Sequence, residues 1–113
     1  MRTFYYKSSC STCRKALKLL AERGVSVEER DMSKRPLSAA EIRALIGDSE
    51  IVPFLNPRND MYRERGMKAN PPTKDEAIAL MAENANLIRR PLLVQGEQIL
   101  FGYDEEAYRA LPE

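Results

Sequence analysis

Hydrophobic residues change their spacing along the first part of the chain. The aromatic run at 3–6 is short and typical of a buried strand. Residues 13–24 carry apolar side chains three and four positions apart, which predicts a helix that ends at Gly24. Alternating apolar residues from Val25 predict a second strand that continues to about Glu29. Short connections within this strand, helix and strand favour a parallel pair joined by a right-handed crossover.

The middle of the chain shows helical patterns with clear starts. Ser38 is followed three residues later by Glu41, a capping box that precedes an apolar face. Thr73 and Glu76 repeat this arrangement before a second apolar face. A short helix is predicted near 58–65, where prolines break the preceding chain into turns.

The C-terminal part returns to strands. Leu92–Val94 and Gln98–Phe101 flank Gly96, which is typical of a β-hairpin. Asp104 then precedes a short terminal helix as its cap. The order β-α-β … β-β-α predicts an α/β protein with a thioredoxin-like fold, in which a helical segment at about 36–86 is inserted beside a mixed four-stranded sheet.

Length and charge limit the classes of protein. A chain of 113 residues is expected to form one domain, residues 1–113. Its 18 basic and 17 acidic residues give a net charge of +1, which argues against direct nucleic-acid binding. Since we find no apolar run typical of a signal peptide or a membrane span, we expect a cytoplasmic protein without a membrane partner.

The chain contains no histidine and only two cysteines. Catalysis by Ser-His-Asp or Cys-His groups is therefore excluded, and so is the usual nitrogen ligand of metals. Structural zinc sites need four Cys or His ligands, and one copy of this chain supplies two. We therefore expect no bound metal, although a site shared with a second chain stays open as an alternative.

Cys10 and Cys13 form a CxxC motif where the first predicted strand turns into the helix. The helix start offers unpaired amide groups and a positive dipole end, both of which stabilise a thiolate. We expect Cys10 to be a nucleophile with a lowered pKa, and Cys13, one turn later, to resolve a mixed disulfide. The alternative is a pair of ordinary buried cysteines.

The segments YKSSCSTCRKAL, RRPLLV and FGYDEEAYRALP resemble the ArsC/Spx family, which includes arsenate reductases and Spx-type transcription regulators. The resemblance extends over nearly the whole chain and is strongest to the Spx-like branch. It implies that Cys10 is the catalytic cysteine, that Pro91 is a cis-proline, and that Arg90 lines the thiolate pocket. Arg58 matches another pocket arginine. Guanidinium groups suit this role because they bind oxyanions bidentately.

The chain differs from the arsenate reductases of this family at three places. It adds Cys13, has Tyr6 near the place of an upstream histidine, and has Gly102 near the place of a third pocket arginine. These differences predict weak oxyanion binding and favour a dithiol mechanism. The glycine with which Spx regulators meet RNA polymerase falls on Glu50 here, and Gly47 lies three residues away.

We therefore expect a thiol–disulfide oxidoreductase of the arsenate-reductase-like family. Glutathione with glutaredoxin, or thioredoxin, would reduce the Cys10–Cys13 disulfide, and we expect no organic cofactor and a monomer. One alternative is an Spx-like redox-sensing regulator that binds the RNA polymerase α subunit through residues 38–85. Another is a glutaredoxin-coupled arsenate reductase.

Overall fold

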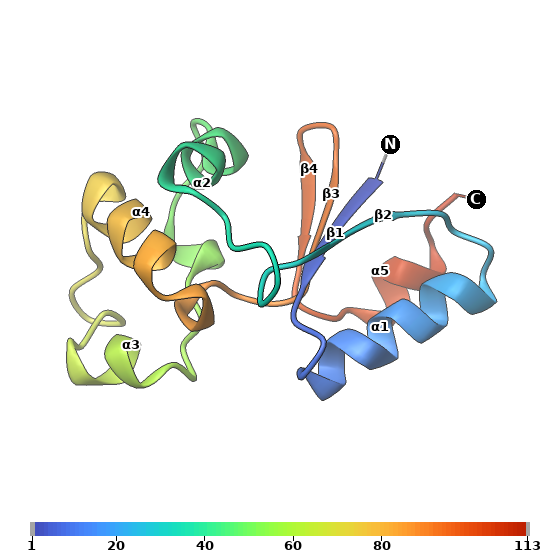
Figure 1. The fold of residues 1–113 in the computed structure, drawn as a ribbon, viewed down its shortest axis with the longest axis horizontal. Helices are drawn as coiled ribbons and strands as arrows, with labels where there is room; N and C mark the ends of the chain where they lie inside the picture. The colour runs from blue at the N-terminus through green and yellow to red at the C-terminus, as the bar shows by residue number, and fades with distance from the viewer. Residues whose placement is uncertain (1, 113) are drawn as a thin grey trace. The chain divides into compact units, whose positions relative to one another are not determined.

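The computed structural model describes residues Arg2–Pro112, and the chain divides into two compact units. The first combines the segment up to Arg35 with the segment from Arg90 onward. The second is the continuous segment Pro36–Arg89. Figure 1 shows that strands gather in the first unit and that the second is built of helices.

The first unit contains a mixed four-stranded sheet, as predicted. Its strands are β1 (Arg2–Tyr6), β2 (Glu28–Asp31), β3 (Leu92–Gln95) and β4 (Gln98–Phe101), in the spatial order β2-β1-β3-β4. β1 and β2 are parallel, whereas β1–β3 and β3–β4 are antiparallel. This confirms the parallel pair and the hairpin expected from the sequence, and it gives the unit a thioredoxin-like α/β fold.

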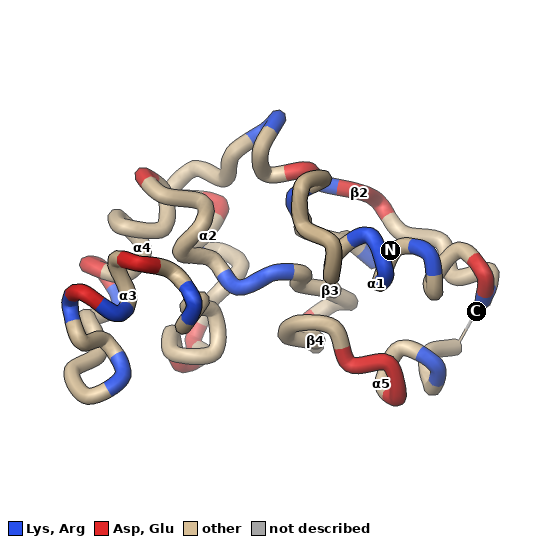
Figure 2. Tube along the Cα trace, turned by 90° about the horizontal axis from the view of Figure 1, so that it is seen from below, with Lys and Arg blue, Asp and Glu red and all other residues tan. Residues whose placement is uncertain are grey.

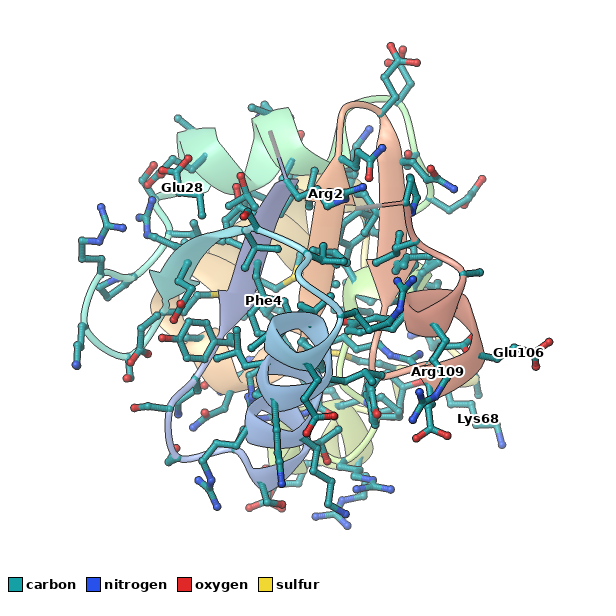
Figure 3. All side chains as sticks on the ribbon, turned by 90° about the vertical axis from the view of Figure 1, so that its right-hand side faces the viewer. Arg2, Phe4, Glu28, Lys68, Glu106 and Arg109 are labelled. Atoms are coloured by element: carbon teal, nitrogen blue, oxygen red, sulfur yellow. The ribbon has the colours of Figure 1, made fainter. Side chains whose placement is uncertain are left out.

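Two helices, α1 (Ser11–Glu22) and α5 (Glu105–Arg109), pack against each other and share one core with the sheet. Figure 3 shows Phe4 between the sheet and α1, while Glu106 and Arg109 project from α5 away from the core. The buried members of this core come from both helices, from β1 and β3 and from the connection after α1: Phe4, Ala16, Leu19, Leu20, Val25, Leu93 and Tyr108.

The second strand begins later than predicted. We expected it from Val25 to about Glu29, but β2 spans Glu28–Asp31. Val25 instead closes the end of α1, because its amide donates to the Leu20 carbonyl at 2.9 Å while Gly24 adopts a φ of +70°. In this Schellman-type ending Val25 caps the helix and packs in the core. Its apolar side chain therefore marks the end of α1 and not the start of a strand.

Two glycines with left-handed backbone flank β4, one in the hairpin turn before it and one just after it. Gly96, between β3 and β4, has a φ of +61°, as the turn requires. Gly102, just after β4, has a φ of +72°, and its amide donates to the Pro91 carbonyl at 2.8 Å. Left-handed backbone is unfavourable for residues with a Cβ, so both positions favour glycine.

The second unit contains the three predicted helices, which are α2 (Ala39–Ile46), α3 (Asp60–Glu64) and α4 (Lys74–Glu83). Ser38 and Glu41 form the expected capping box, and the Thr73 hydroxyl accepts from the Glu76 amide at 3.2 Å. Two short 3₁₀ turns, Val52–Phe54 and Ala85–Leu87, were not predicted. Within Arg2–Pro112, we find no helix with the length and apolar character to cross a membrane.

Candidate functional site

Cys10 is the N-cap of α1, immediately before the first helical residue. Its φ and ψ are −85° and 116°, and its sulfur accepts a hydrogen bond from the Cys13 amide at 3.4 Å. Ser, Thr, Asp or Asn usually supplies this acceptor. The Cys10 amide also donates to the Lys7 carbonyl at 3.0 Å, which fixes the turn before the helix. The local fold therefore aims the sulfur at the free amides of the helix start.

The charge pattern of α1 differs from that of the other helices. No acidic residue lies in its first turn, whereas the first turns of α2, α3, α4 and α5 all contain one or two. Arg14, Lys15 and Lys18 follow Cys10 instead, and all three are exposed. Figure 2 shows this positive charge along α1 and negative charge at the start of α5. The positive end of the α1 dipole is thus left for the Cys10 sulfur.

The pKa of the Cys10 thiol is lowered from its ordinary value. Burial of the partly exposed sulfur is the largest single cause and opposes ionisation, but the hydrogen bonds from the thiol and amide of Cys13, together with the hydrogen bond and positive charge of the Arg90 guanidinium group, outweigh it. A thiolate is the nucleophilic form of cysteine. Cys10 therefore combines exposure, a helix N-terminus and a cationic neighbour, which are the features of a reactive cysteine.

Cys13 has the opposite environment. It is fully buried, and this burial raises the pKa of its thiol to about 12. The amide of Lys7 acts in the opposite direction, while hydrogen bonding and charge from Cys10 raise the pKa further. Both cysteines are free thiols in this structure. At neutral pH one thiol of the pair is thus prepared to ionise, and the other stays protonated.

Arg90 enters the site from the residue before β3. The Arg90–Pro91 peptide bond is cis, as predicted, and Pro91 is buried. The Nε and Nη1 atoms of Arg90 are also buried, and neither has a hydrogen-bond partner in the described part of the chain. Since buried donors without partners are costly, these two groups are well suited to receive an anionic oxygen beside Cys10.

The structure brings Cys10, Cys13, Arg90 and Pro91 into one unit. Arg58, the other predicted pocket residue, belongs to the second unit, where it is exposed and its amide donates to Asn56 Oδ1 at 3.0 Å. Its role in binding a substrate stays a prediction.

Tyr6, near the place of the family's histidine, donates from its hydroxyl to Glu29 Oε1 at 3.0 Å. Burial and the Glu29 carboxylate raise the pKa of Tyr6, so the phenol stays protonated.

Two buried polar groups near this site were not predicted. Asp31 is 9% exposed, and the fully buried Tyr108 has a hydroxyl without a hydrogen-bond partner among residues 2–112. Burial and the proximity of Cys13 raise the pKa of Tyr108. A signal for Asp31 was present in the sequence, because DMS resembles the Asx turns that follow strands. For Tyr108 we find no such signal, since an aromatic residue in an amphipathic helix usually indicates core packing.

The described residues contain no cluster of three or more Cys, His, Asp or Glu side chains that could hold a metal ion. The chemistry available at the site is therefore that of two thiols and a guanidinium group. Such a set can exchange thiols with disulfides, and it can bind an anion next to the reacting sulfur.

The chain is similar over most of its length to several known proteins. A model of the ArsC family matches residues 5–111. The chain is 36% identical to the uncharacterized protein YusI of Bacillus subtilis, over 94% of this chain and 93% of YusI. It is 30% identical to the global transcriptional regulator Spx 2 of Lactococcus lactis, over 97% of this chain and 85% of that protein.

Among solved structures, the chain is similar to a protein from Streptococcus mutans described as a possible arsenate reductase. The two are 36% identical with a TM-score of 0.74, and the match covers 91% of each chain. The chain is thus similar over most of its length to proteins of more than one described role.

Proposed function

Because this chain belongs to the ArsC family, we propose that it is a thiol–disulfide oxidoreductase that uses Cys10 and Cys13 as a redox pair. The observation that carries the proposal is the placement of the two thiols, with the partly exposed Cys10 as the N-cap of α1 and Cys13 fully buried three residues later. This placement lowers the pKa of Cys10 and raises that of Cys13. A dithiol reductase needs this division between an attacking and a resolving thiol.

In the first step the Cys10 thiolate attacks one sulfur of a substrate disulfide. A bond forms between Cys10 Sγ and that sulfur, and the substrate S–S bond breaks. The second substrate sulfur leaves as a thiolate and takes a proton from water. Arg90 supports this step in two ways, because it stabilises the Cys10 thiolate and its free Nε and Nη1 donors can hold a carboxylate of the substrate.

In the second step Cys13 resolves the mixed disulfide. Its thiol gives its proton to water, and the resulting thiolate attacks Cys10 Sγ one helical turn away. The Cys10–Cys13 disulfide forms, and the remaining substrate sulfur leaves as a thiolate. Two electrons have then passed from the protein to the substrate. Once Cys10 is part of a mixed disulfide, its negative charge no longer opposes ionisation of Cys13, which favours this step.

Reduction of the Cys10–Cys13 disulfide closes the cycle. We propose glutathione with glutaredoxin, or thioredoxin, as the electron donor, because each supplies a thiol that can attack an exposed disulfide sulfur. Cys10 is the partly exposed member of the pair, and Cys13 is buried, so Cys10 is the sulfur that such a donor would attack.

The proposal is tested by disulfide reduction with the reduced chain and its two serine variants. Cys10→Ser should abolish turnover, because the attacking thiolate is lost. Cys13→Ser should accumulate a covalent adduct with the substrate thiol, which intact-mass spectrometry detects after acid quenching. Exposed Ser11→Ala is the control and should react as the unmodified chain does. If iodoacetamide at neutral pH labels Cys13 before Cys10, the assignment of roles is wrong.

A redox-sensing transcription regulator is the second candidate. The similarity to Spx 2 over nearly the full chain supports it, since the same CxxC pair could act as a switch instead of a catalyst. The partner would then be the RNA polymerase α subunit. Retention of the purified α C-terminal domain on the immobilised chain, in the oxidised or reduced state, would favour the regulator over a plain reductase.

A further inference from the structure

The acidic residues of this chain are distributed unevenly along the sequence. Residues 1–21 contain five basic residues and no acidic one, so this segment carries a net charge of +5. The remaining 13 basic and 17 acidic residues give residues 22–113 a net charge of −4. The near balance of the complete sequence therefore conceals a positive segment, and that segment contains both cysteines.

The structure places three of these cations on the exposed side of α1. Arg14, Lys15 and Lys18 are exposed, and we call them the basic face of α1 (Figure 2). Cys10 precedes Arg14 by four residues and Lys18 by eight, and side chains at this spacing lie along one side of a helix. Because a helix rises about 1.5 Å per residue, Lys15 and Lys18 lie about 8 and 12 Å from Cys10 along the axis. The basic face is therefore next to the reacting sulfur.

The members of the basic face differ in their contacts. Arg14 Nη1 donates to the Ser8 carbonyl at 2.9 Å, so this guanidinium group also holds the turn before Cys10. The ion pairs found within residues 2–112 involve neither Lys15 nor Lys18. Glu22, the first acidic residue of the chain, follows Lys18 by four residues and is not paired with it. The positive charge of the two lysines is therefore available to a binding partner.

The other end of α1 offers a position for a control. Arg23, just after the helix, donates from Nη1 to the carbonyl oxygens of Tyr108 and Leu111 at 3.3 and 2.7 Å. These hydrogen bonds bring the end of α5 to the end of α1, and the exposed Arg109 is the last residue of α5. Arg109 is therefore separated from Cys10 by the length of α1, roughly 18 Å for its 12 residues.

We propose that the basic face of α1 is a docking surface for an acidic protein segment that presents a disulfide to Cys10. The segment carries Asp or Glu close to its own cysteine. An extended chain covers about 3.3 Å per residue, so carboxylates two to four residues from that cysteine match the distances from Cys10 to Lys15 and Lys18. Complementary charge raises the rate of encounter and favours such a partner over a neutral or basic one. This inference names the substrate class of the proposed function, and it rests on that function only in taking Cys10 as the reacting thiol.

The test uses peptides of equal length that carry an N-terminal iodoacetyl group and differ only in charge. The acidic peptide has Asp at the second to fourth positions, the neutral peptide has Asn there, and the basic peptide has Lys. Cys10 Sγ attacks the methylene carbon, a C–S bond forms and iodide leaves, so the reaction needs no turnover. At low salt we expect the acidic peptide to react roughly three- to tenfold faster than the neutral one, and the basic peptide to be the slowest. The differences should disappear at about 1 M salt, where the Debye length is about 3 Å.

Charge-reversal variants show whether the preference comes from the basic face. Lys15→Glu and Lys18→Glu introduce another good helix former at exposed positions, and each should lower the acidic-to-neutral rate ratio by roughly two- to fivefold. The ratio is measured within one protein, so a changed pKa of Cys10 affects both peptides equally. Arg109→Glu makes the same change in net charge at the far end of α1 and should leave the ratio unchanged. Peptide mass spectrometry confirms that Cys10 is the labelled residue.

Four results would overturn the inference. Equal rates for the three peptides at low salt would mean that the basic face does not select by charge. An unchanged ratio in both lysine variants would mean that the preference comes from another group, such as Arg90. An equal fall of the ratio in Arg109→Glu would mean that only net charge acts. Protection of Cys10 from iodoacetamide by a short DNA duplex, but not by the acidic peptide without its iodoacetyl group, would indicate a nucleic-acid site instead.

Failure of the docking surface can be distinguished from failure of the proposed function. A chain that reduces disulfides and reacts equally with all three peptides would retain the proposed function and lose this inference. Conversely, a chain that shows the expected charge preference and reduces no disulfide would keep the docking surface and lose the proposed reductase activity.

Discussion

The Cys13 amide donates to the Cys10 sulfur at 3.4 Å, so the second cysteine of the motif stabilises the first through its backbone as well as its thiol. The backbone contribution does not depend on the side chain at position 13. Cys13→Ala should therefore keep part of the lowered pKa of Cys10 while removing the resolving thiol. The measurement is the alkylation profile of Cys10, and a return to the profile of a free cysteine would contradict a role for the amide.

Replacing Arg90 should slow the alkylation of Cys10. In Arg90→Met the thiolate loses a charge-assisted hydrogen bond, which contributes about 1.5–3 kcal/mol, so the pKa of Cys10 should rise and alkylation at neutral pH should fall by roughly tenfold. Arg90→Lys keeps the positive charge but lacks the planar guanidinium group, so its alkylation rate should lie between those of the unmodified chain and Arg90→Met. Arg109→Met, on the exposed side of α5, is the control. An equal rate in Arg90→Met would exclude the arginine from the thiolate site.

Arsenate should be a poor substrate compared with a disulfide. Gly102 lies near the place of the family's third pocket arginine, and loss of one bidentate partner weakens oxyanion binding by about one to two orders of magnitude. The measurement is arsenate-dependent oxidation in a glutathione–glutaredoxin couple beside a disulfide assay with the same preparation. Efficient arsenate reduction would contradict this prediction and favour an arsenate reductase over a thiol–disulfide oxidoreductase.

The structure changes what we expect of Gly102→Arg. From the sequence this variant should raise arsenate turnover, but Gly102 is buried with a φ of +72°. A side chain there costs about 1–2 kcal/mol in left-handed backbone. We expect a lower free energy of unfolding in Gly102→Ala by about that amount, measured by urea titration. Gly102→Arg should lose at least as much, so its turnover must be compared at equal folded fraction.

Tyr108→Phe should keep or increase stability. The Tyr108 hydroxyl is buried and has no partner in the described residues, so removing it eliminates a desolvated polar group while the ring packing remains. The raised pKa of Tyr108 also has a pH consequence. Stability associated with the protonated phenol is complete below its unfolded pKa of about 10 and is lost as the pH rises toward the higher folded value. Urea titrations at pH 8 to 11 should show a smaller alkaline loss in Tyr108→Phe, and an equal loss would contradict this.

Asp31 should give stability the opposite dependence on pH, with a loss at low pH. Its folded pKa is lowered, so its stabilising contribution is present above the unfolded pKa of about 3.9 and is lost as the pH falls through the folded value. Asp31→Asn should therefore lose stability at neutral pH and show a flatter acid limb below about pH 4. Parallel acid limbs in the two proteins would mean that the carboxylate is equally stable in the unfolded chain.

The sequence predicted best those features that depend on local spacing. The sheet with its hairpin, the capping box at Ser38 and the N-terminal position of Cys10 were expected from such patterns and are confirmed. The cis bond before Pro91 was expected from the resemblance to the ArsC/Spx family and is also confirmed. Helix caps and hairpin turns are encoded within a few residues. Their patterns can therefore be identified without knowledge of the tertiary contacts.

Features that depend on tertiary contacts could not be predicted in this way. The start of β2 at Glu28 follows from its register with Thr3 and from the use of Val25 in the α1 ending. The burial of Asp31 follows from its place opposite Tyr6. Polar residues such as Glu28 and Asp31 give no hydrophobic pattern, so only the pairing of the strands shows where the strand lies.

The division of the chain has a consequence for synthesis of the protein. The unit that holds the cysteines is assembled from two segments separated in sequence by Pro36–Arg89, so β1 can pair with β3 only after that whole segment has left the ribosome. Until then Arg90 is not yet beside Cys10, and one of the groups that lower the pKa of the thiol is still missing. The nascent chain therefore carries a less reactive cysteine than the finished protein, and full nucleophilicity arises only when the C-terminal segment joins the sheet.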